Sequence, residues 1–510
     1  MPTFCLEYTL IFDNPRSFGG KLLETPRYLG RIGHPAIGIR IPEIFLTGIL
    51  RAYKKRNVAG GLMLSFGRET APQKVIDAPP GKYEITRGHT GTSIKKYMTL
   101  GARAALREGV IVEIEADHIM VIGSSTSAVK RLVGIHELES EISDEELRRS
   151  MDYNILAIDE ALSTGYVNSF TTDTTDLLDR TADSLDNSKL SEKFHKRIKN
   201  TEELLSRNLG EFKFQGAKPF TCKLTKEDVM RFALKYEKSI EVNAQIYDYI
   251  KKKIDRPFGF EISLDETKEK TGFKDLIFYL NEWKLSARHV DFVAPNIGFK
   301  KRMDFYGNLN ELRDRVSRLD AIARYFGALL SIHSGSGTTP YSSKGRGTYK
   351  ALLDATNGQL KYKISGVYYE LLLQKLASFS RGSKERKFYN LIFDSVYDFL
   401  NKEVRRRGKL ASPILERQLL SYKKNVREGK IERRDPRAKF FRFNSYLALN
   451  FRNERGIRYI REGLVRMYKQ DQFLKKTIDE EVERLTLRLI DGLHFSNNVE
   501  DVLRSGAPAS

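Results

Sequence analysis

Four apolar runs between residues 258 and 366 each end in a polar residue, and stretches of helical period separate them. The residues that end the runs are Glu266, Asn296, His333 and Ser365. Their spacing of about 30 to 37 residues is that of one strand, one loop and one amphipathic helix. Strands that alternate with helices at this period predict a parallel sheet.

Polar side chains at the ends of strand after strand are typical of a (β/α) barrel, whose active site lies at the carboxyl ends of its strands. A doubly wound open sheet has the same local pattern but concentrates its site near one switch point. We therefore predict an α/β fold with a TIM-like (β/α) barrel. The strand pattern stops near residue 380. We expect a mixed α/β region that leads into the barrel, the barrel itself, and a basic, mostly α-helical C-terminal region, at residues 1–108, 109–380 and 381–510.

Two earlier segments predict further strands. The apolar segment "VIVEIEADHIMVI" carries Asp117 and His118, and the segment "YVNSFTTDT" ends in polar residues that include Asp173. Neighbouring residues of an extended strand point to opposite faces, so Asp117 and His118 can line one pocket only if the strand is interrupted there. His118 is either a metal ligand or general base, or a salt-bridged edge residue.

The composition is that of a folded protein. A chain of 510 residues with 40% hydrophobic residues can bury the core of a large barrel and an added domain. No apolar run approaches the roughly 18 residues that a membrane span requires. The first residues lack the features of a signal peptide, and Cys5 and Cys222 are too few for a disulfide framework. We expect no membrane partner and a cytoplasmic location.

A net charge of +21 predicts an anionic partner: nucleic acid, an acidic lipid surface, or a small carboxylate or phosphate. Basic residues between positions 433 and 442 are interleaved with Phe440, Phe441 and Phe443. That pattern could bind a nucleic-acid backbone and stack bases. We favour the alternative that it is the solvated face of charged helices, so nucleic acid is the less favoured partner.

Glu266 and His333 together suggest a metal centre. Divalent ions such as Zn²⁺ or Mn²⁺ are held by a few histidine and carboxylate side chains, with one position open for substrate. Taken singly, Glu266 could instead pair with a lysine, and His333 could be a hydrogen-bonded core histidine. Because both follow apolar strands directly, we favour the functional interpretation.

Two basic segments suit an anionic substrate. Lys301 and Arg302 follow the strand that ends at Asn296, and Lys361 and Lys363 occupy alternate positions of one strand, hence one face. A lysine inside a barrel is costly unless it has a partner or a function. The loop "SSKGRGT" could cradle an anion but lacks the spacing of a P-loop, and we interpret it first as a mobile loop.

These segments resemble the tagaturonate/fructuronate epimerases, metal-dependent enzymes of sugar-acid catabolism. The resemblance runs in order through "EADHI", "FTTDTTDLLDRTAD", "EISLDET", "FVAPNIGFKKRMDFYGNL", "LSIHSGSG" and "KYKISG". It implies a barrel epimerase that uses a divalent ion (Zn, Mn, Ni or Co) and a small anionic sugar. The metal ligands that it implies are His118, Glu266 and His333, and the implied pocket residues are Lys301, Asp304 and Lys363.

A possible reaction course follows from the resemblance. Enolisation alone cannot invert a carbinol two carbons from a ketone, whereas retro-aldol cleavage, rotation and re-addition can, with a metal to stabilise the charge. Abstraction and return of the hydrogen by another route stays open. We assign proton transfer to Asp117 or Lys363 and contact with the substrate carboxylate to Lys301 or Arg302. The expected substrate-binding residues are Asp173, Asn296, Lys301, Arg302, Asp304, Ser334 and Ser336.

The chain also departs from the family pattern. Gly337 and Thr338 stand where the family has an Asp-Lys pair, and Lys361 stands where it has a histidine. The first change would remove an acid/base or carboxylate contact, and the second a metal ligand. A different metal-dependent sugar isomerase, epimerase or aldolase on the same barrel therefore stays open, as does a homo-oligomer. A nucleic-acid-binding protein that uses the basic C-terminal region is the more distant alternative.

Overall fold

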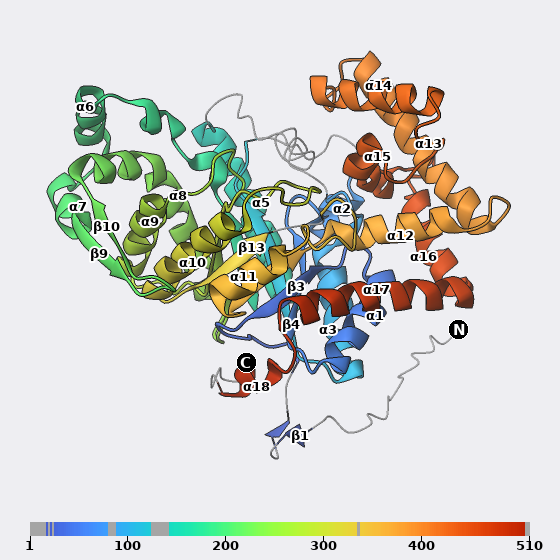
Figure 1. The fold of residues 1–510 in the computed structure, drawn as a ribbon, viewed down its shortest axis with the longest axis horizontal. Helices are drawn as coiled ribbons and strands as arrows, with labels where there is room; N and C mark the ends of the chain where they lie inside the picture. Colours follow the sequence, from blue (N-terminus) through green and yellow to red (C-terminus); the bar gives the residue numbers. More distant parts are fainter. Residues whose placement is uncertain are drawn as a thin grey trace, which may run out of the picture.

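The computed structural model describes residues 17–18, 21–22, 25–79, 88–123, 142–333 and 337–504. Its centre is a closed barrel of parallel strands, in which each strand pairs with the next in chain order and the last pairs with the first (Figure 1). The predicted barrel, rather than an open sheet, is confirmed. The barrel strands are β3 (His34–Gly38), β4 (Gly60–Ser65), β7 (Val112–Met120), β8 (Ser169–Asp173), β11 (Gly259–Leu264), β12 (Phe292–Pro295), β13 (Leu329–His333) and β14 (Leu360–Ile364).

A long helix follows each barrel strand before the next strand begins. These helices are α1 (Pro42–Lys55), α3 (Ile94–Glu108), α5 (Asp144–Ser163), α8 (Lys226–Lys253), α9 (Phe273–Leu285), α10 (Leu309–Tyr325), α11 (Thr348–Thr356) and α12 (Gly366–Ser378). Capping residues in the sequence set several of their starts. Ser143 and Thr225 each accept a hydrogen bond from the backbone three residues on and complete a capping box.

The barrel begins earlier in the chain than residue 109. Strands β3 and β4 both lie within residues 25–79, and β3 closes the barrel against β14. Between β4 and α3 lie the short elements β5 (Thr70–Ala71), α2 (Gln73–Asp77) and β6 (Thr92–Ser93). A two-stranded ribbon, β1 (Ser17–Phe18) and β2 (Lys21–Leu22), precedes the barrel.

An insertion follows β8 and lies at one side of the barrel (Figure 1). The antiparallel hairpin of β9 and β10 places Phe214 and Phe220 against each other, with Tyr325 of α10 on Phe214. The elements of the insertion are η1 (Thr175–Leu177), η2 (Arg180–Ser184), α6 (Asn187–Arg197), α7 (Thr201–Asn208), β9 (Gly210–Phe214) and β10 (Phe220–Leu224).

The C-terminal region is helical, as predicted, and its part from residue 384 to residue 470 lies on the opposite side of the barrel from the insertion (Figure 1). Phe440 and Phe441 are fully buried there, and Phe441 packs on Phe393 at 4.5 Å. These two rings are core residues and cannot stack bases. The elements are α13 (Lys384–Arg405), α14 (Pro413–Arg427), α15 (Lys439–Asn444), η3 (Ser445–Asn450), α16 (Tyr459–Gln470), α17 (Gln472–Gly492) and α18 (Val499–Arg504).

The last helices return to the start of the barrel. Helix α17 packs along α1, and α18 places Val502 in a small apolar cluster with Leu29 and Ile111. The side chain of Asn498 accepts from Ala59 N (2.8 Å) and donates to the carbonyls of Ala59 and Gly33. Asn498 thus joins the segments that lead into β3 and β4. Within the described residues, none of the helices combines the length and the hydropathy that a membrane crossing requires.

Candidate metal and substrate site

A cavity of about 140 Å³ opens at the carboxyl ends of the barrel strands. A larger cleft of about 660 Å³ lies at the other end, beside Phe258, Val290 and Gly327, which precede strands. The mouth is where barrels carry their chemistry, whereas the opposite end serves stability, so the smaller cavity is the candidate site. It is lined by Arg40, Met63, Ser65, Arg68, Glu69, Asp117, His118, Asp265, Glu266, Lys301, Arg302, His333, Lys363, Ser365 and Gly366.

A bulge in β7 brings Asp117 and His118 to the same cavity. The pairing of β7 with β8 shifts register between Ala116 and Ile119, and His118 has a left-handed φ of 44°. A bulge adds a residue to one strand and redirects the side chains around it. The interruption that the sequence required for both side chains to share a pocket is therefore present.

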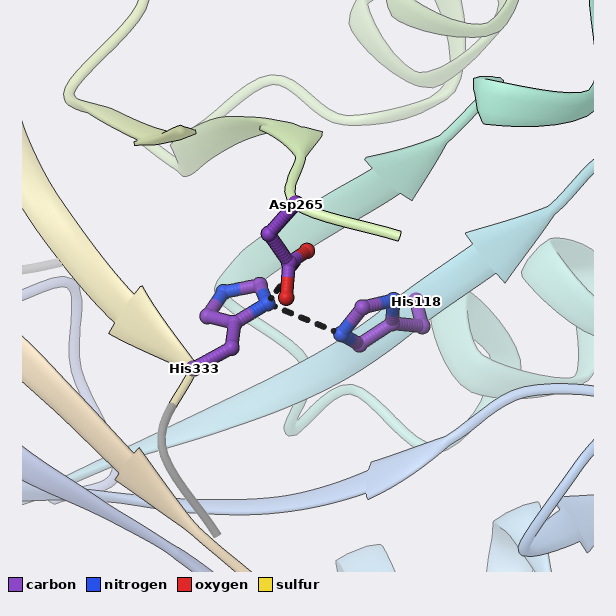
Figure 2. Close-up of side chains that lie close together, drawn as sticks. All are labelled: His118, Asp265 and His333. Atoms are coloured by element: carbon purple, nitrogen blue, oxygen red, sulfur yellow. Dashed lines mark hydrogen bonds and ion pairs between the residues drawn. The ribbon is translucent and has the colours of Figure 1, made fainter. Parts of the chain in front are cut away.

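His118 and His333 face each other across the mouth (Figure 2). Nε2 of His118 lies 3.1 Å from Nδ1 of His333, and the same Nδ1 lies 3.2 Å from Oδ1 of Asp265. Three strands supply these groups: β7 carries His118, β13 ends at His333, and Asp265 follows β11. Two imidazoles and a carboxylate that converge in this way offer the ligand types that bind divalent metals.

A carboxylate backs the far nitrogen of each histidine. Nε2 of His333 lies 2.6 Å from Oε1 of Glu261, and Nδ1 of His118 lies 3.5 Å from Oδ2 of Asp173. Metal-binding histidines commonly have such a partner, which fixes the ring and its tautomer. Burial opposes the charged form of His333, but Asp265 and Glu261 outweigh it and raise its pKa to about 10.

The donor set at the mouth fits a metal ion. Ligand atoms of His118, His333 and Asp265 all lie within 4.8 Å of one another, as do those of His118, Asp173 and Glu266. Nδ1 of His118 is buried and makes no hydrogen bond within the described residues. Glu266, an expected ligand, also accepts from Arg68 and Lys301 at 3.0 Å, whereas Asp265 lies 3.2 Å from the His333 nitrogen that faces His118.

A network of buried charges supports the floor of the site. Lys363 Nζ lies 2.8 Å from Asp117 and 2.5 Å from Glu115, and Lys361 Nζ lies 2.8 Å from Glu115. Burial disfavours the charged lysines, but these carboxylates outweigh it and hold the pKa of both well above the usual range. Lys363 in turn holds the pKa of Asp117 below its usual range, against the effect of burial. Both members of the Asp117–Lys363 pair stay charged.

The structure places the other expected site residues in different surroundings. The amide of Asn296 bonds to Thr267 and to the backbone of Gly298, outside the cavity lining. Asp173 is fully buried behind His118. Lys301 and Arg302 line the cavity as expected, and Ser365 lines it too. Ser334 and Ser336 lie outside the described residues.

Asp304 fills the space beside Gly337. Its Oδ1 accepts from Thr338 N (2.8 Å) and Ser342 Oγ (2.5 Å). A Cβ at position 337 would lie 2.1 Å from both Asp304 Oδ1 and Ser342 Oγ, so a larger residue there would displace both side-chain ends. Asp304 thus braces the loop after β13 and does not line the cavity. The carboxylate expected at 337 from the family pattern would collide with it.

Sequence reasoning missed several contributors to the site, among them two acidic and two basic residues. Glu261 and Asp265 lie on the strand and loop around Glu266, where a period-2 pattern could have marked Glu261 as facing the barrel interior. Arg40 and Arg68 follow β3 and β4. No strand was predicted before Val110, so no signal pointed to these two arginines.

Comparison with known proteins fits this geometry. A family described as UxaE, tagaturonate epimerase, matches residues 153–405 of the chain. The chain belongs to the tagaturonate epimerase family. It is therefore an enzyme of the isomerase class, as expected from the sequence. No curated protein matches the chain by sequence.

Solved structures show the same fold. The glycerol-complexed fructuronate-tagaturonate epimerase UxaE from Cohnella laeviribosi superposes with a TM-score of 0.63 and 18% identity, over 92% of this chain and 83% of that one. The native structure of the same Cohnella protein gives a TM-score of 0.61 and 17% identity over the same shares. These similarities extend the shared fold beyond residues 153–405.

Proposed function

We propose that this epimerase interconverts fructuronate and tagaturonate, or closely related ketouronates, at a divalent metal centre in the barrel mouth. The observation that carries the proposal is the facing pair of His118 and His333, each backed by a carboxylate and joined by Asp265. The family and the printed activity of the Cohnella protein support the choice of substrate.

The metal would be held by His118 and His333 with a carboxylate from the Asp265–Glu266 segment. When bound, it would supply positive charge where negative charge develops on the ketone oxygen of the substrate. Glu261 acts as a positioning residue, because its hydrogen bond fixes the orientation of the His333 ring. Asp173 lies 3.5 Å from Nδ1 of His118 and supplies negative charge behind that ring.

The inverted carbon lies two carbons from the ketone, so bond cleavage and re-formation account for the inversion. The hydroxyl on that carbon loses its proton, the bond toward the ketone breaks, and its electron pair passes to the carbon next to the ketone. The new aldehyde turns about its remaining bond, and the same bond then forms on the opposite face. The hydroxyl regains its proton, so atoms and charge balance.

Asp117 and Lys363 are the proposed proton-handling pair. The Asp117 carboxylate is ionised and can accept a proton, while the Lys363 ammonium can donate a hydrogen bond to a developing alkoxide. Because its pKa is raised, Lys363 does not supply a neutral amine that could form a Schiff base. This favours metal-assisted cleavage over the lysine-dependent aldolase route.

The test is direct. Purified protein is incubated with tagaturonate or fructuronate after chelation and after addition of Zn²⁺, Mn²⁺, Ni²⁺ or Co²⁺, and NMR follows the appearance of the epimer. We expect interconversion only with metal, and its loss in His333→Ala. Turnover that survives chelation would exclude the metal centre. Turnover of other ketoses in place of ketouronates would favour the alternative sugar isomerase or aldolase that the changes at Gly337 and Lys361 leave open.

A further inference from the structure

Several buried polar atoms near the mouth have no hydrogen-bond partner among the described residues. They are Nη1 of Arg40, Nη1 of Arg302, both ring nitrogens of His89 and the hydroxyl of Tyr446. The rings of His89 and Tyr446 are 4.4 Å apart, and both feel the charges of Arg40 and Arg302. Buried donors without partners are costly, and such a cluster beside a cavity indicates a missing ligand.

Arg40 is held rigidly with one edge left open. It is 7% exposed, and its Nε donates to Glu69 at 2.7 Å and to Ser365 Oγ at 3.2 Å. Its Nη2 lies 2.5 Å from the same Glu69 carboxylate, whereas Nη1 remains unpaired although the residue lines the cavity. Glu69 therefore fixes the guanidinium, and Nη1 is left to bind a ligand.

Arg302 approaches the cavity from another loop. Its guanidinium lies 5.3 Å from the ring of Phe443, and its Nη1 is buried without a partner. Burial, with smaller contributions from Arg40 and Arg442, lowers its pKa to about 10, although Glu370 acts in the opposite direction. Two buried guanidinium groups that repel each other beside the same cavity create a preference for an anion.

The other cations of the cavity bind carboxylates, as Arg40 does, but among the described lysines and arginines of the lining only Arg40 and Arg302 have a buried side-chain nitrogen without a hydrogen bond. Lys301 and Arg68 both bind Glu266 at 3.0 Å, and Lys363 binds Asp117 at 2.8 Å. From the sequence we expected Lys301 or Arg302 to contact the substrate carboxylate. The structure favours Arg302 over Lys301 and adds Arg40 as a second candidate.

We propose that Arg40 and Arg302 form a carboxylate subsite, with Tyr446 of the C-terminal helical region as a neighbouring hydrogen-bond donor. The inference rests on the proposed function, since it assigns the acid group of the ketouronate to this side of the cavity and the ketone to the side of His118 and His333. The subsite also retains the cleaved fragment that bears the carboxylate while its aldehyde turns. The C-terminal region thus contributes to the active site.

The experiment compares an acid with its neutral counterpart. Tagaturonate and tagatose, which carries a hydroxymethyl group in place of the carboxylate, are assayed with the wild type, Arg302→Met and Tyr446→Phe. Loss of a charge-assisted hydrogen bond should lower kcat/KM for tagaturonate by about 10- to 100-fold in Arg302→Met, with tagatose little affected. Tyr446→Phe should show a smaller loss. Arg346→Met, at an exposed arginine of the loop after β13, is the matched control and should behave as wild type.

Calorimetric titration of the metal-free protein separates this inference from the proposed function. Binding of tagaturonate that weakens in Arg302→Met but not in Arg346→Met supports the subsite, even if no epimer forms. Epimerisation that Arg302→Met leaves unchanged overturns the subsite while the proposed function stands. Arg40→Met leaves Glu69 without its cation, so this variant is used only if its melting temperature matches that of the wild type. Absence of both turnover and binding overturns both proposals.

Discussion

At the scale of single residues, we expect the hydrogen bond at Nε2 of His333 to determine the metal affinity of the barrel mouth. Glu261 holds Nε2 at 2.6 Å and leaves Nδ1 directed at His118. We expect Glu261→Gln to weaken metal affinity about 10- to 100-fold, because partners of this kind orient the ligand and raise its basicity. Competition with a chromophoric chelator measures the change.

The matched control for Glu261→Gln is Glu113→Gln. Glu113 belongs to the same buried network, 3.3 Å from Lys361, but it does not contact His118 or His333. Equal losses of metal affinity in both variants would show that the network, and not the orientation of His333, determines affinity.

The residues of the site were predictable to the extent that each ends an apolar strand. Glu266 and His333 stood out because a polar residue interrupts an otherwise apolar run at a regular interval. Asp265 did not stand out, because it is one of several polar residues in the turn that holds Glu266. Arg40 did not stand out either, because it follows β3, a strand that the sequence pattern did not predict. The loop sets the direction of a side chain that follows the end of a strand, and loop sequences lack the hydrophobic periodicity from which such directions are predicted.

At the scale of elements, Lys344 ties the loop after β13 to the loop after β12. Its ammonium is 1% exposed and donates to the carbonyls of Lys300 (2.7 Å) and Met303 (3.2 Å), around the segment that carries Lys301 and Arg302. The segment "SSKGRGT", which the sequence led us to interpret first as a mobile loop, therefore braces two loops in the structure.

Lys344 makes stability depend on pH in a defined direction. Burial lowers its pKa to about 7, Asp304 offsets part of this, and the unfolded chain keeps the ordinary value of 10.5. Between these values the unfolded state binds more protons, so the stability of the wild type relative to Lys344→Met should rise with pH from about 7 to 10. The slope approaches about 1.4 kcal/mol per pH unit.

Denaturant unfolding at several pH values measures this slope. Lys350→Met is the control, because Lys350 is 77% exposed and pairs only with Asp354 on its own helix in the described structure. A pH-independent difference between wild type and Lys344→Met would contradict the burial argument.

Elements were predicted best where periodicity was long and regular. The strands from β11 to β14 were recognised with their order, whereas β3 and β4 were missed because "HPAIG" and "GGLMLS" are short and contain proline or glycine. The sequence showed only that the strand had to be interrupted if Asp117 and His118 were to share a pocket. It could not show that the bulge in β7 exists, because a register shift depends on the partner strand.

At the scale of the whole molecule, a buried ion pair docks the C-terminal region on the barrel mouth. Arg442 is 9% exposed, binds Glu370 of α12 through Nε (2.6 Å) and Nη2 (3.1 Å), and donates to the carbonyl of Gly337. Arg442→Ala removes both of these charge-assisted contacts from the buried Glu370 carboxylate. We expect a loss of about 3–5 kcal/mol in the free energy of unfolding.

The chain offers a close control in Arg437, which also binds a carboxylate, Asp435, through two nitrogens but has a side chain that is 74% exposed. The Asp435 side chain is 6% exposed, but the Arg437 guanidinium is in solvent, so Arg437→Ala should cost less than Arg442→Ala, about 1 kcal/mol. Chemical denaturation compares the two variants, and similar losses would show that burial does not set the strength of the Arg442 contact.

The contact of Asn498 with Ala59 and Gly33 has a consequence for synthesis. Gly33 and Ala59, which Asn498 joins, are synthesised long before Asn498 itself. Synthesis proceeds at a rate on the order of 5–20 residues per second. The edge of β3 that pairs with β14 also stays unpaired until β14 has been synthesised. The nascent chain therefore carries an open strand edge for tens of seconds, on the order of the delay that these rates imply. Chaperone dependence during translation should exceed that during refolding of the released chain.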